Sequence, residues 1–350
     1  GITQGHRGRM MNLDVLAATA REMVDNHRGL LAADESTGTI KKRFDSIGVE
    51  STETARRDYR ELLFRTKGIG KFISGAILYD ETLRQKAADG TTLVQLLQAE
   101  NVIPGIKVDG GARALPGSSQ EKITEGLDGL PERVAEYVTL GARFAKWRAV
   151  ITIGDGMPSD YCIHTNAHAL ARYARICQEG GLVPIVEPEV LMDGSHTIDV
   201  CEAVTTKTLE AVYHELYLQG VQLEGTILKP NMIISASDCP NQASADEIAA
   251  RTVKVLKRCV PTAVPGIMFL SGGQSEEEAT RNLNAMNANH GPLPWALSYS
   301  YGRALQQSAL KAWKGEAGNV PAAQAALLKR AQLNSAACAG NYAGEAEKAA

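Results

Sequence analysis

The sequence predicts an α/β protein folded as a single (β/α)8 TIM barrel, and three observations support this fold class. Eight short apolar runs recur along the 350-residue chain, each separated from the next by a segment with helical patterning. The runs do not alternate with polar residues, which indicates strands buried on both faces and therefore a parallel sheet. The chain also lacks the glycine fingerprint of dinucleotide-binding open sheets. Eight strand–helix units without that fingerprint favour a closed barrel.

Strands and helices are expected to alternate from one end of the chain to the other. The expected strands lie within residues 29–33, 72–78, 102–109, 144–150, 183–189, 223–232, 266–273 and 295–303. The expected helices cover residues 13–26, 51–67, 93–99, 130–140, 163–179, 197–219, 244–259 and 276–286, and further helices follow Arg303. Ser244 and Glu247 have the spacing of a capping box at the start of one helix. We expect one domain over residues 1–350, with helical extensions at both ends.

Composition excludes several classes of protein. The net charge is −3, with 44% hydrophobic and 22% charged residues, which is typical of a globular protein and not of a general nucleic-acid binder. No apolar run approaches the ~18 residues that a membrane span needs, and residues 1–11 lack an apolar signal core. The six cysteines are scattered, without a CxxC motif. They indicate reduced thiols, so we expect a cytoplasmic protein without a membrane span or a nucleic-acid partner.

The stretch from Leu223 to Met232 carries the first candidate functional residue, Lys229. It runs apolar after Gly225 and ends with Lys229 directly before Pro230. Because proline cannot continue a central ladder, Lys229 should occupy the last rung of its strand. Apolar neighbours disfavour a charged amine, and lowering its pKa from ~10.4 by about 3 units would make it a nucleophile suited to Schiff-base chemistry. The alternative is a structural lysine whose amine extends to solvent from a strand end.

Charged and polar residues gather at the carboxyl ends of the predicted strands, which meet at one mouth of a barrel. They are Asp34, Lys107, Asp109, Lys146, Arg148, Glu187, Glu189, Lys229, Ser271, Ser300 and Arg303. Buried charges are costly unless they are paired, so this concentration needs a reason. It indicates an active site, and the alternative is an ion-pair network that only fills the barrel.

Two glycine-rich turns follow the seventh and eighth predicted strands, at residues 271–273 and 300–303. Barrel enzymes commonly bind phosphate there, because glycines let backbone amides approach the oxygens and an arginine adds a planar charged group. We expect a second cationic cluster on the opposite side of the mouth, formed by Ser36, Thr39, Lys42, Arg43, Lys107 and Arg148. Two anion sites beside a lysine indicate a substrate phosphorylated at both ends.

The histidines predict no metal site. His164 and His168 have helical spacing, but Thr165 stands where the HExxH motif has glutamate, so a helix surface is the better interpretation. We therefore expect neither a metal nor a cofactor.

Eight stretches, in chain order and one for each predicted strand, together resemble a known family, the class I (Schiff-base) fructose-1,6-bisphosphate aldolases of eukaryotic type. They are LLAADESTGTIKKRF, FISGAIL, IPGIKVD, GARFAKWR, VPIVEPEV, EGTILKPNM, FLSGGQSEEEA and SYGRALQ. The resemblance implies reversible cleavage of fructose 1,6-bisphosphate to dihydroxyacetone phosphate and glyceraldehyde 3-phosphate, in glycolysis and gluconeogenesis. It also implies a homotetramer.

The resemblance implies a role for each matching residue. Lys229 is expected to form the Schiff base, Glu187 to dehydrate the carbinolamine, and Glu189 to position the charges around it. Lys146 is expected to depress the pKa of Lys229, and Asp34 to engage the hydroxyl beside the scissile bond. One phosphate site is implied at Ser271, Gly272, Ser300, Gly302 and Arg303. The other is implied at Ser36, Thr39, Lys42, Arg43, Lys107 and Arg148.

The sequence departs from the family at two places. Gly110 stands where relatives usually have lysine, and the chain stops at Ala350, whereas relatives typically continue to a terminal tyrosine used for proton transfer. We therefore expect a truncated C-terminal tail, with Schiff-base formation retained and turnover reduced. Two other functions stay open: a Schiff-base lyase of the transaldolase kind acting on sugar monophosphates, and a scaffold that binds cytoskeletal or receptor tails, alone or beside the enzyme activity.

Overall fold

The computed structural model describes residues 2–348, with side chains from residue 13 onward, and it confirms the predicted barrel. Eight parallel strands close in the order β1-β10-β9-β8-β7-β6-β3-β2. Their bounds are β1 (Gly29–Ala33), β2 (Ile73–Leu78), β3 (Ile103–Lys107), β6 (Phe144–Ile151), β7 (Val183–Val190), β8 (Ile227–Leu228), β9 (Gly266–Phe269) and β10 (Ala296–Tyr301). The expected C-terminal truncation after Ala350 lies outside the described residues.

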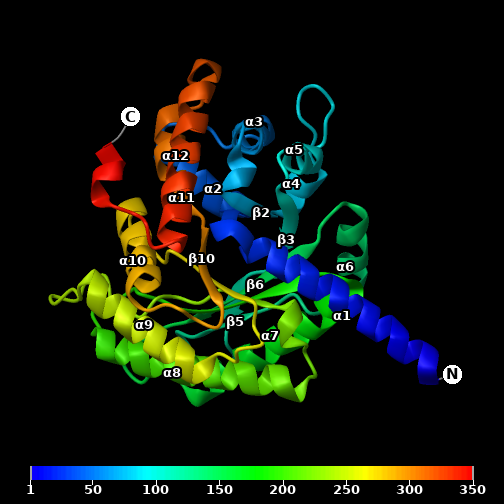
Figure 1. Cartoon of the computed structure of the whole chain (residues 1–350), viewed down its shortest axis with the longest axis vertical. Helices are drawn as coiled ribbons and strands as arrows, with labels where there is room; N and C mark the ends of the chain where they lie inside the picture. The colour runs from blue at the N-terminus through cyan, green and yellow to red at the C-terminus, as the bar shows by residue number, and fades with distance from the viewer. Residues whose placement is uncertain (1, 349–350) are drawn as a thin grey trace.

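Helices surround the barrel (Figure 1). They are α1 (Ile2–Val24), α2 (Thr37–Asp45), α3 (Glu53–Phe64), α4 (Asp80–Arg84), α5 (Leu93–Ala99), α6 (Leu130–Thr139), α7 (Asp160–Gly180), α8 (Ile198–Leu218), α9 (Ala245–Cys259), α10 (Glu276–Asn289), α11 (Arg303–Trp313) and α12 (Val320–Cys338). Side-chain oxygens satisfy free amides at several helix starts. Ser244, for example, accepts a hydrogen bond from the Glu247 amide, as the capping spacing predicts.

The apolar core has two parts, inside and outside the barrel wall. Inside, side chains such as Leu30, Phe144 and Met268 form one buried cluster with Leu16 and Met23 of α1. The first helix therefore closes the lower, amino-terminal end of the barrel. Outside, a larger cluster fills the space between the strands and the surrounding helices. Apolar packing at the floor leaves the carboxyl end free for polar groups.

The structure corrects the predicted elements at several places. Two helices, α2 and α4, lie in segments where no helix or strand was expected. The strand expected within 223–232 is only Ile227–Leu228, because residues Leu223–Gly225 form a 3-10 turn and Pro230 has no amide to donate. A short antiparallel pair, β4 (Ala112–Ala114) and β5 (Lys122–Thr124), lies in the segment expected to be loop. The first helix begins at Ile2, well before residue 13.

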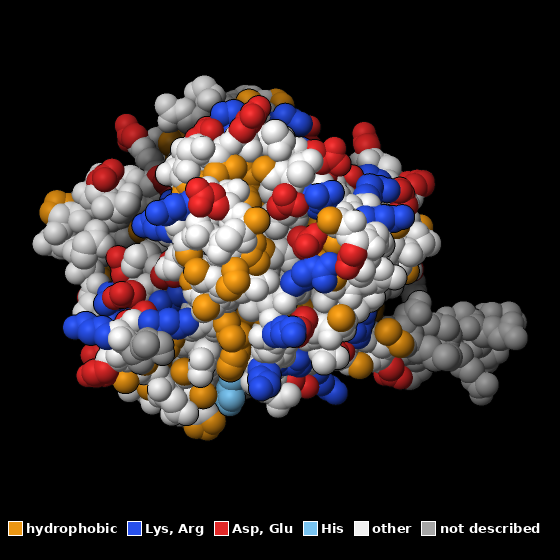
Figure 2. All heavy atoms as spheres, turned by 90° about the horizontal axis from the view of Figure 1, so that it is seen from above, with side chains coloured by type: hydrophobic (Ala, Val, Ile, Leu, Met, Phe, Trp, Pro, Cys, Tyr) orange, Lys and Arg blue, Asp and Glu red, His pale blue; other side chains and the backbone are white. Residues whose placement is uncertain are grey.

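The surface of the described chain is mixed in charge. Figure 2 shows acidic and basic side chains interspersed on one face, with a band of apolar side chains between them. None of the described helices is both long enough and apolar enough to cross a membrane. All six cysteines are buried and unpaired.

Gly105 of β3 leads to a stability prediction. A Cβ at this position would overlap the aromatic ring of buried Phe144 inside the barrel. Gly105→Ala should therefore lower the free energy of unfolding by about 1–3 kcal/mol, as overpacked cores do. Gly38→Ala is the control, because a Cβ there meets nothing within 4 Å, and it should be neutral or stabilising by up to about 1 kcal/mol. Urea denaturation of both variants measures the difference, and equal stabilities would contradict the packing argument.

Candidate active site

A cavity of about 670 Å3 opens at the carboxyl ends of the strands, and we call it the mouth cavity. All sixteen residues predicted for the site line it: Asp34, Ser36, Thr39, Lys42, Arg43, Lys107, Lys146, Arg148, Glu187, Glu189, Lys229, Ser271, Gly272, Ser300, Gly302 and Arg303. Asp109, which also follows a predicted strand, is not among the residues that line the cavity. Its carboxylate accepts from the amides of Gly111 and Arg148, both at 3.0 Å, and so supports the turn.

Four buried charges of alternating sign cross the floor of the mouth cavity, and we call them the charge chain. Lys146 donates to Asp34 at 2.8 Å and lies 3.7 Å from Glu187. Glu187 in turn lies 3.6 Å from Lys229. None of the four residues exceeds 8% exposure. Asp34 and Lys229 directly follow β1 and β8, whereas Lys146 and Glu187 lie within the longer strands β6 and β7. The four residues belong to four different strands, so only the closed barrel brings them together.

Lys229 sits at the end of β8, on the rung that the sequence predicts. Its amide donates to Val186 of β7 at 2.8 Å, and the next residue is the proline that ends the ladder. Burial of the amine lowers its pKa, and the positive charge of Lys146 lowers it further against the opposing pull of Glu187 and Asp34. Lys229 therefore has more of the neutral, nucleophilic amine than an exposed lysine has.

The pKa values of Lys146 and Asp34 are shifted so that the charged form of each side chain is favoured. Burial alone would raise the pKa of Asp34, but the charges of Lys146 and Lys229 outweigh it and lower the pKa to about 2. Burial likewise disfavours the Lys146 cation, but Asp34 and Glu187 raise its pKa above the usual lysine value. The pKa values of two lysines in one cavity are therefore shifted in opposite directions, because Lys146 has a close carboxylate partner and Lys229 does not.

Two glutamates on β7 have different surroundings. Glu187 Oε1 is buried without a hydrogen bond, although both lysine amines lie within 4 Å. Glu189 accepts from Arg148 Nε at 2.6 Å. Burial raises the pKa of Glu189, and the neighbouring Glu187 adds to the rise despite the pull of Arg148. A carboxylate with unused hydrogen-bonding capacity beside a neutral amine is suited to proton transfer.

The predicted anion-binding groups are all at the mouth, but their arrangement differs from the expected one. Because β1 pairs with β10, the α2 side of the mouth adjoins the loop that carries Gly302 and Arg303. Arg43 Nη2 lies only 3.8 Å from where a Cβ on Gly302 would be. The prediction that Ser36, Thr39, Lys42 and Arg43 lie opposite the glycine-rich turns was therefore wrong. The predicted second cluster also included Lys107 of β3 and Arg148 of β6. These two strands are not neighbours of β9 and β10, so both residues lie away from the glycine-rich turns.

The cavity also contains residues that sequence reasoning gave no role. Glu35, Leu270, Gln307 and Leu310 all contribute to its wall. Glu35 stands between two predicted site residues, which was an available signal. Gln307 and Leu310 lie on α11 and carry no local pattern that marks them. Ser300 was predicted, and its Oγ is buried without a partner among the described residues.

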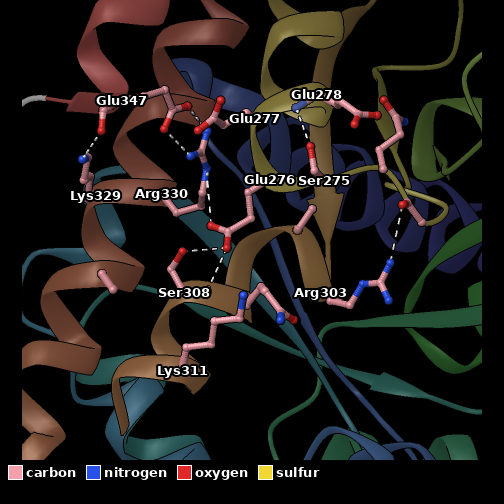
Figure 3. Close-up of a pocket in the computed structure, with 15 residues that line it drawn as sticks. Ser275, Glu276, Glu277, Glu278, Arg303, Ser308, Lys311, Lys329, Arg330 and Glu347 are labelled. Carbon is pink, nitrogen blue, oxygen red and sulfur yellow. Dashed lines mark hydrogen bonds and ion pairs between the residues drawn. The ribbon is translucent and has the colours of Figure 1, made fainter. Parts of the chain in front are cut away.

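A second cleft of about 770 Å3 lies beside the mouth cavity and shares Arg303 with it. Figure 3 shows it between α10, α11, α12 and the C-terminal turn Gly344–Lys348. Its buried charges are largely paired with one another: Arg330 contacts Glu347 at 2.7 Å, and Ser308 donates to Glu276 at 2.7 Å. The buried lysines Lys146 and Lys229 and the buried Glu187 line the mouth cavity and not this cleft, so the mouth cavity is the better candidate for chemistry.

The histidines of α7 lie at the helix surface, as predicted. Both His164 and His168 are exposed, and His168 faces Glu215 at 3.4 Å. Within residues 2–348, no group of three or more His, Cys, Asp or Glu side chains could hold a metal ion.

A closed (β/α)8 barrel whose mouth buries two lysines beside a carboxylate, with several further cations around them, is typical of a barrel enzyme that acts on anionic substrates. Residues 15–350 match the family model described as fructose-bisphosphate aldolase class-I. The chain therefore belongs to the class-I fructose-bisphosphate aldolase family, whose members are carbon–carbon lyases.

Similar proteins agree with this assignment. Over 95% of the chain, it is 59% identical to fructose-bisphosphate aldolase 1 of Toxoplasma gondii, covering 92% of that protein. It is 56% identical to fructose-bisphosphate aldolase of Plasmodium falciparum, with 95% and 90% of the two chains covered. A solved structure of Plasmodium falciparum aldolase, in complex with TRAP and a small molecule inhibitor, superposes with a TM-score of 0.94 at 55% identity and covers 95% of this chain and 96% of that one.

The charge chain predicts how the pKa of Lys229 changes when the charge of Lys146 is removed. Lys146→Met should raise the pKa of Lys229 by about one unit, because it removes a positive charge and leaves two carboxylates without their partner. The measurement is the pH dependence of acylation of Lys229 by an amine-reactive reagent, followed by peptide mass mapping. Lys71→Met, which changes an exposed lysine outside the cavity, is the control and should leave the midpoint unchanged. An unshifted midpoint in Lys146→Met would rule out the proposed influence.

Proposed function

We propose that this aldolase cleaves fructose 1,6-bisphosphate reversibly through a Schiff base on Lys229. The observation that carries the proposal is a buried lysine of lowered pKa lying 3.6 Å from a carboxylate oxygen without a hydrogen bond. A neutral amine can attack the substrate ketone, and the iminium that follows acts as an electron sink. The family assignment supports the substrate.

Three members of the charge chain have a step in this mechanism, and the fourth, Lys146, lowers the pKa of Lys229. Glu187 takes a proton from the Lys229 ammonium, and the neutral amine then adds to the ketone carbon. After a proton moves from the nitrogen to the oxygen, Glu187 returns its proton to the departing hydroxyl of the carbinolamine, so that water leaves and the iminium forms. Asp34 accepts the proton of the hydroxyl beside the scissile bond. That carbon–carbon bond breaks as its electron pair moves to the iminium, which releases glyceraldehyde 3-phosphate and leaves an enamine. Protonation and hydrolysis of the enamine then release dihydroxyacetone phosphate and regenerate Lys229.

Cations and backbone amides around the mouth would hold the phosphates of the substrate. Ser271, Gly272, Gly302 and Arg303 provide one group, and Lys107 and Arg148 provide cations on strands away from it. Ser36, Thr39, Lys42 and Arg43 stand next to the first group, so a phosphate on either side lies near an arginine or a lysine. This number of anion-binding groups favours a bisphosphate over the monophosphate substrate of a transaldolase-like lyase.

The cellular setting follows from the proposed reaction. We propose that the protein acts in glycolysis and gluconeogenesis, in the cytoplasm, where its six buried, unpaired cysteines would stay reduced. We also propose that the whole chain works as one domain and assembles as a homotetramer. Exposed apolar side chains at the end of α8, Tyr217 at 81% and Leu218 at 60%, support a further contact surface. Light scattering in solution tests the assembly.

We propose that binding of a polypeptide partner accompanies the enzyme activity. The support is the similar Plasmodium falciparum aldolase, whose solved structure is a complex with TRAP. The expected partners are the tails of receptors or cytoskeletal proteins. A partner that binds at the mouth should compete with fructose 1,6-bisphosphate, which a competition assay with labelled peptide measures.

Trapping the covalent intermediate tests the reaction directly. Borohydride reduction with fructose 1,6-bisphosphate or dihydroxyacetone phosphate, with EDTA present throughout, should give a reduced adduct on Lys229 alone. Lys229→Met should give none, and Glu187→Gln should slow turnover by about 10²–10⁴-fold, as loss of a general acid–base group does. An adduct confined to another lysine would refute the mechanism, and loss of the adduct with EDTA would show a metal requirement.

Substitution of Ser300 tests substrate binding separately from the stability of the fold. Its Oγ has no partner within the described chain, so Ser300→Ala should leave the free energy of unfolding unchanged or slightly higher. If the hydroxyl binds substrate, KM should rise about tenfold, which is the loss of one hydrogen bond. Ser298→Ala on the same strand is the matched control: its Oγ donates to Arg28 at 2.6 Å, so stability should fall by about 1 kcal/mol with KM unchanged. Steady-state kinetics and urea denaturation of both variants decide, and an unchanged KM in Ser300→Ala would remove Ser300 from the site.

A further inference from the structure

The carboxylate of Glu35 is buried between two arginines in the wall of the mouth cavity. Glu35 lies between β1 and α2 and is 7% exposed. Its Oε2 lies 3.6 Å from Arg43 Nε, and its Oε1 lies 3.6 Å from Arg60 Nη2. Glu35 therefore joins a predicted phosphate ligand to a fully buried cation.

Two helices hold this carboxylate in place. Arg60 of α3 donates to the Glu35 backbone carbonyl at 2.8 Å. Gln306 of α11 donates to Glu35 Oε2 at 3.1 Å and to the Ala32 carbonyl at 2.8 Å. The Tyr59 hydroxyl donates to Oε1 of the Gln306 side-chain amide at 2.8 Å and fixes the orientation of that amide. Glu35 is thus anchored from outside the cavity, and none of these contacts needs a ligand.

Arg43 presents different edges of its guanidinium to Glu35 and to the cavity. Its Nε edge faces Glu35, and Nη2 lies beside Gly302, close to the glycine-rich turn. The Nη groups form no hydrogen bond with any residue in the described part of the chain, and the side chain is 21% exposed. Arg43 Nε forms no hydrogen bond, so Glu35 attracts the inner edge of the guanidinium as an ion-pair partner. The outer edge is available for bidentate contact with an anion.

We propose that Glu35 is a positioning residue that fixes Arg43 for the phosphate of the substrate. The inference rests on the proposed function, because it takes a sugar bisphosphate as the ligand. Without the carboxylate, Arg43 would keep its charge but lose its fixed orientation, and substrate binding would weaken. The ion pairs and hydrogen bonds of Glu35 are to Arg43, Arg60 and Gln306 and not to Lys229, so the chemical step should be preserved.

A purely structural role for Glu35 is the competing explanation, since it also balances the buried charge of Arg60. Glu81 provides a matched control. It lies 3.8 Å from Arg60 Nη1 and pairs with Arg56 at 2.7 Å, but it does not contact Arg43 or line the mouth cavity. Loss of either carboxylate should destabilise the fold, and only loss of Glu35 should affect the substrate.

The experiment compares Glu35→Gln, Glu35→Asp and Glu81→Gln in the full chain. Glu35→Asp keeps the charge that Arg60 requires and retracts it from Arg43, so it remains informative if Glu35→Gln folds poorly. Both Glu35 variants should raise KM and the calorimetric Kd for fructose 1,6-bisphosphate about tenfold, with kcat within about twofold of the parent chain. Glu81→Gln should lower Tm without changing KM or Kd. In an Arg43→Ala background, Glu35→Gln should raise Kd no further.

Unchanged affinity in both Glu35 variants would overturn the inference, and so would an equal loss of affinity with and without Arg43. The parent chain separates the inference from the proposed function. If it binds the bisphosphate but does not cleave it, the proposed reaction fails, while the Kd values still decide the role of Glu35.

Discussion

The charge chain of Asp34, Lys146, Glu187 and Lys229 is the interaction on which the rest of the mouth depends. Each charge is buried and compensated by a neighbour of opposite sign, and removal of any one leaves an uncompensated charge in a poorly hydrated site. The order of the ion pairs along the charge chain also determines the direction in which the pKa of each lysine is shifted. Because Asp34 is already committed to Lys146 at 2.8 Å, it stabilises the Lys229 cation less than a free carboxylate would. Lys146 remains an ammonium and Lys229 is biased towards the amine.

The barrel makes this concentration of charge possible by separating apolar and polar packing along its axis. The lower end is filled by Leu30, Phe144 and Met268, and α1 closes it with Leu16 and Met23. Water therefore reaches the charges from one side only. Glycines in the strands, such as Gly105 beside the Phe144 ring, let large side chains fill the interior. Rigid packing below the site holds its polar groups at distances suited to proton transfer.

Much of the fold was predictable from sequence, because strands buried on both faces leave unbroken apolar runs. The residues at the mouth were predictable for a related reason: a barrel brings its strand ends together whichever strands carry them. Their arrangement around the mouth was not, because the pairing of β1 with β10 has no local signal, and this pairing places Arg43 beside Gly302. The pair β4–β5 was missed because its exposed strands carry no apolar run. The role of Glu35 was not predicted, because Arg60 and Gln306, which contact it, are distant from it in sequence.

Closure of the barrel between its first and last strands also determines when the site can exist during synthesis. The hydrogen bond from Gln306 to the Ala32 carbonyl joins residues 274 positions apart, and Ser300, Gly302 and Arg303 lie at the same seam. A ribosome-bound chain that has emerged only as far as β8 lacks Ser271, Gly272, Ser300, Gly302 and Arg303, which line one side of the mouth cavity. The contact between the first and last strands forms late, and only the closed barrel brings the four charges together, so the shifted pKa of Lys229 and the complete set of anion-binding groups both depend on the last strand.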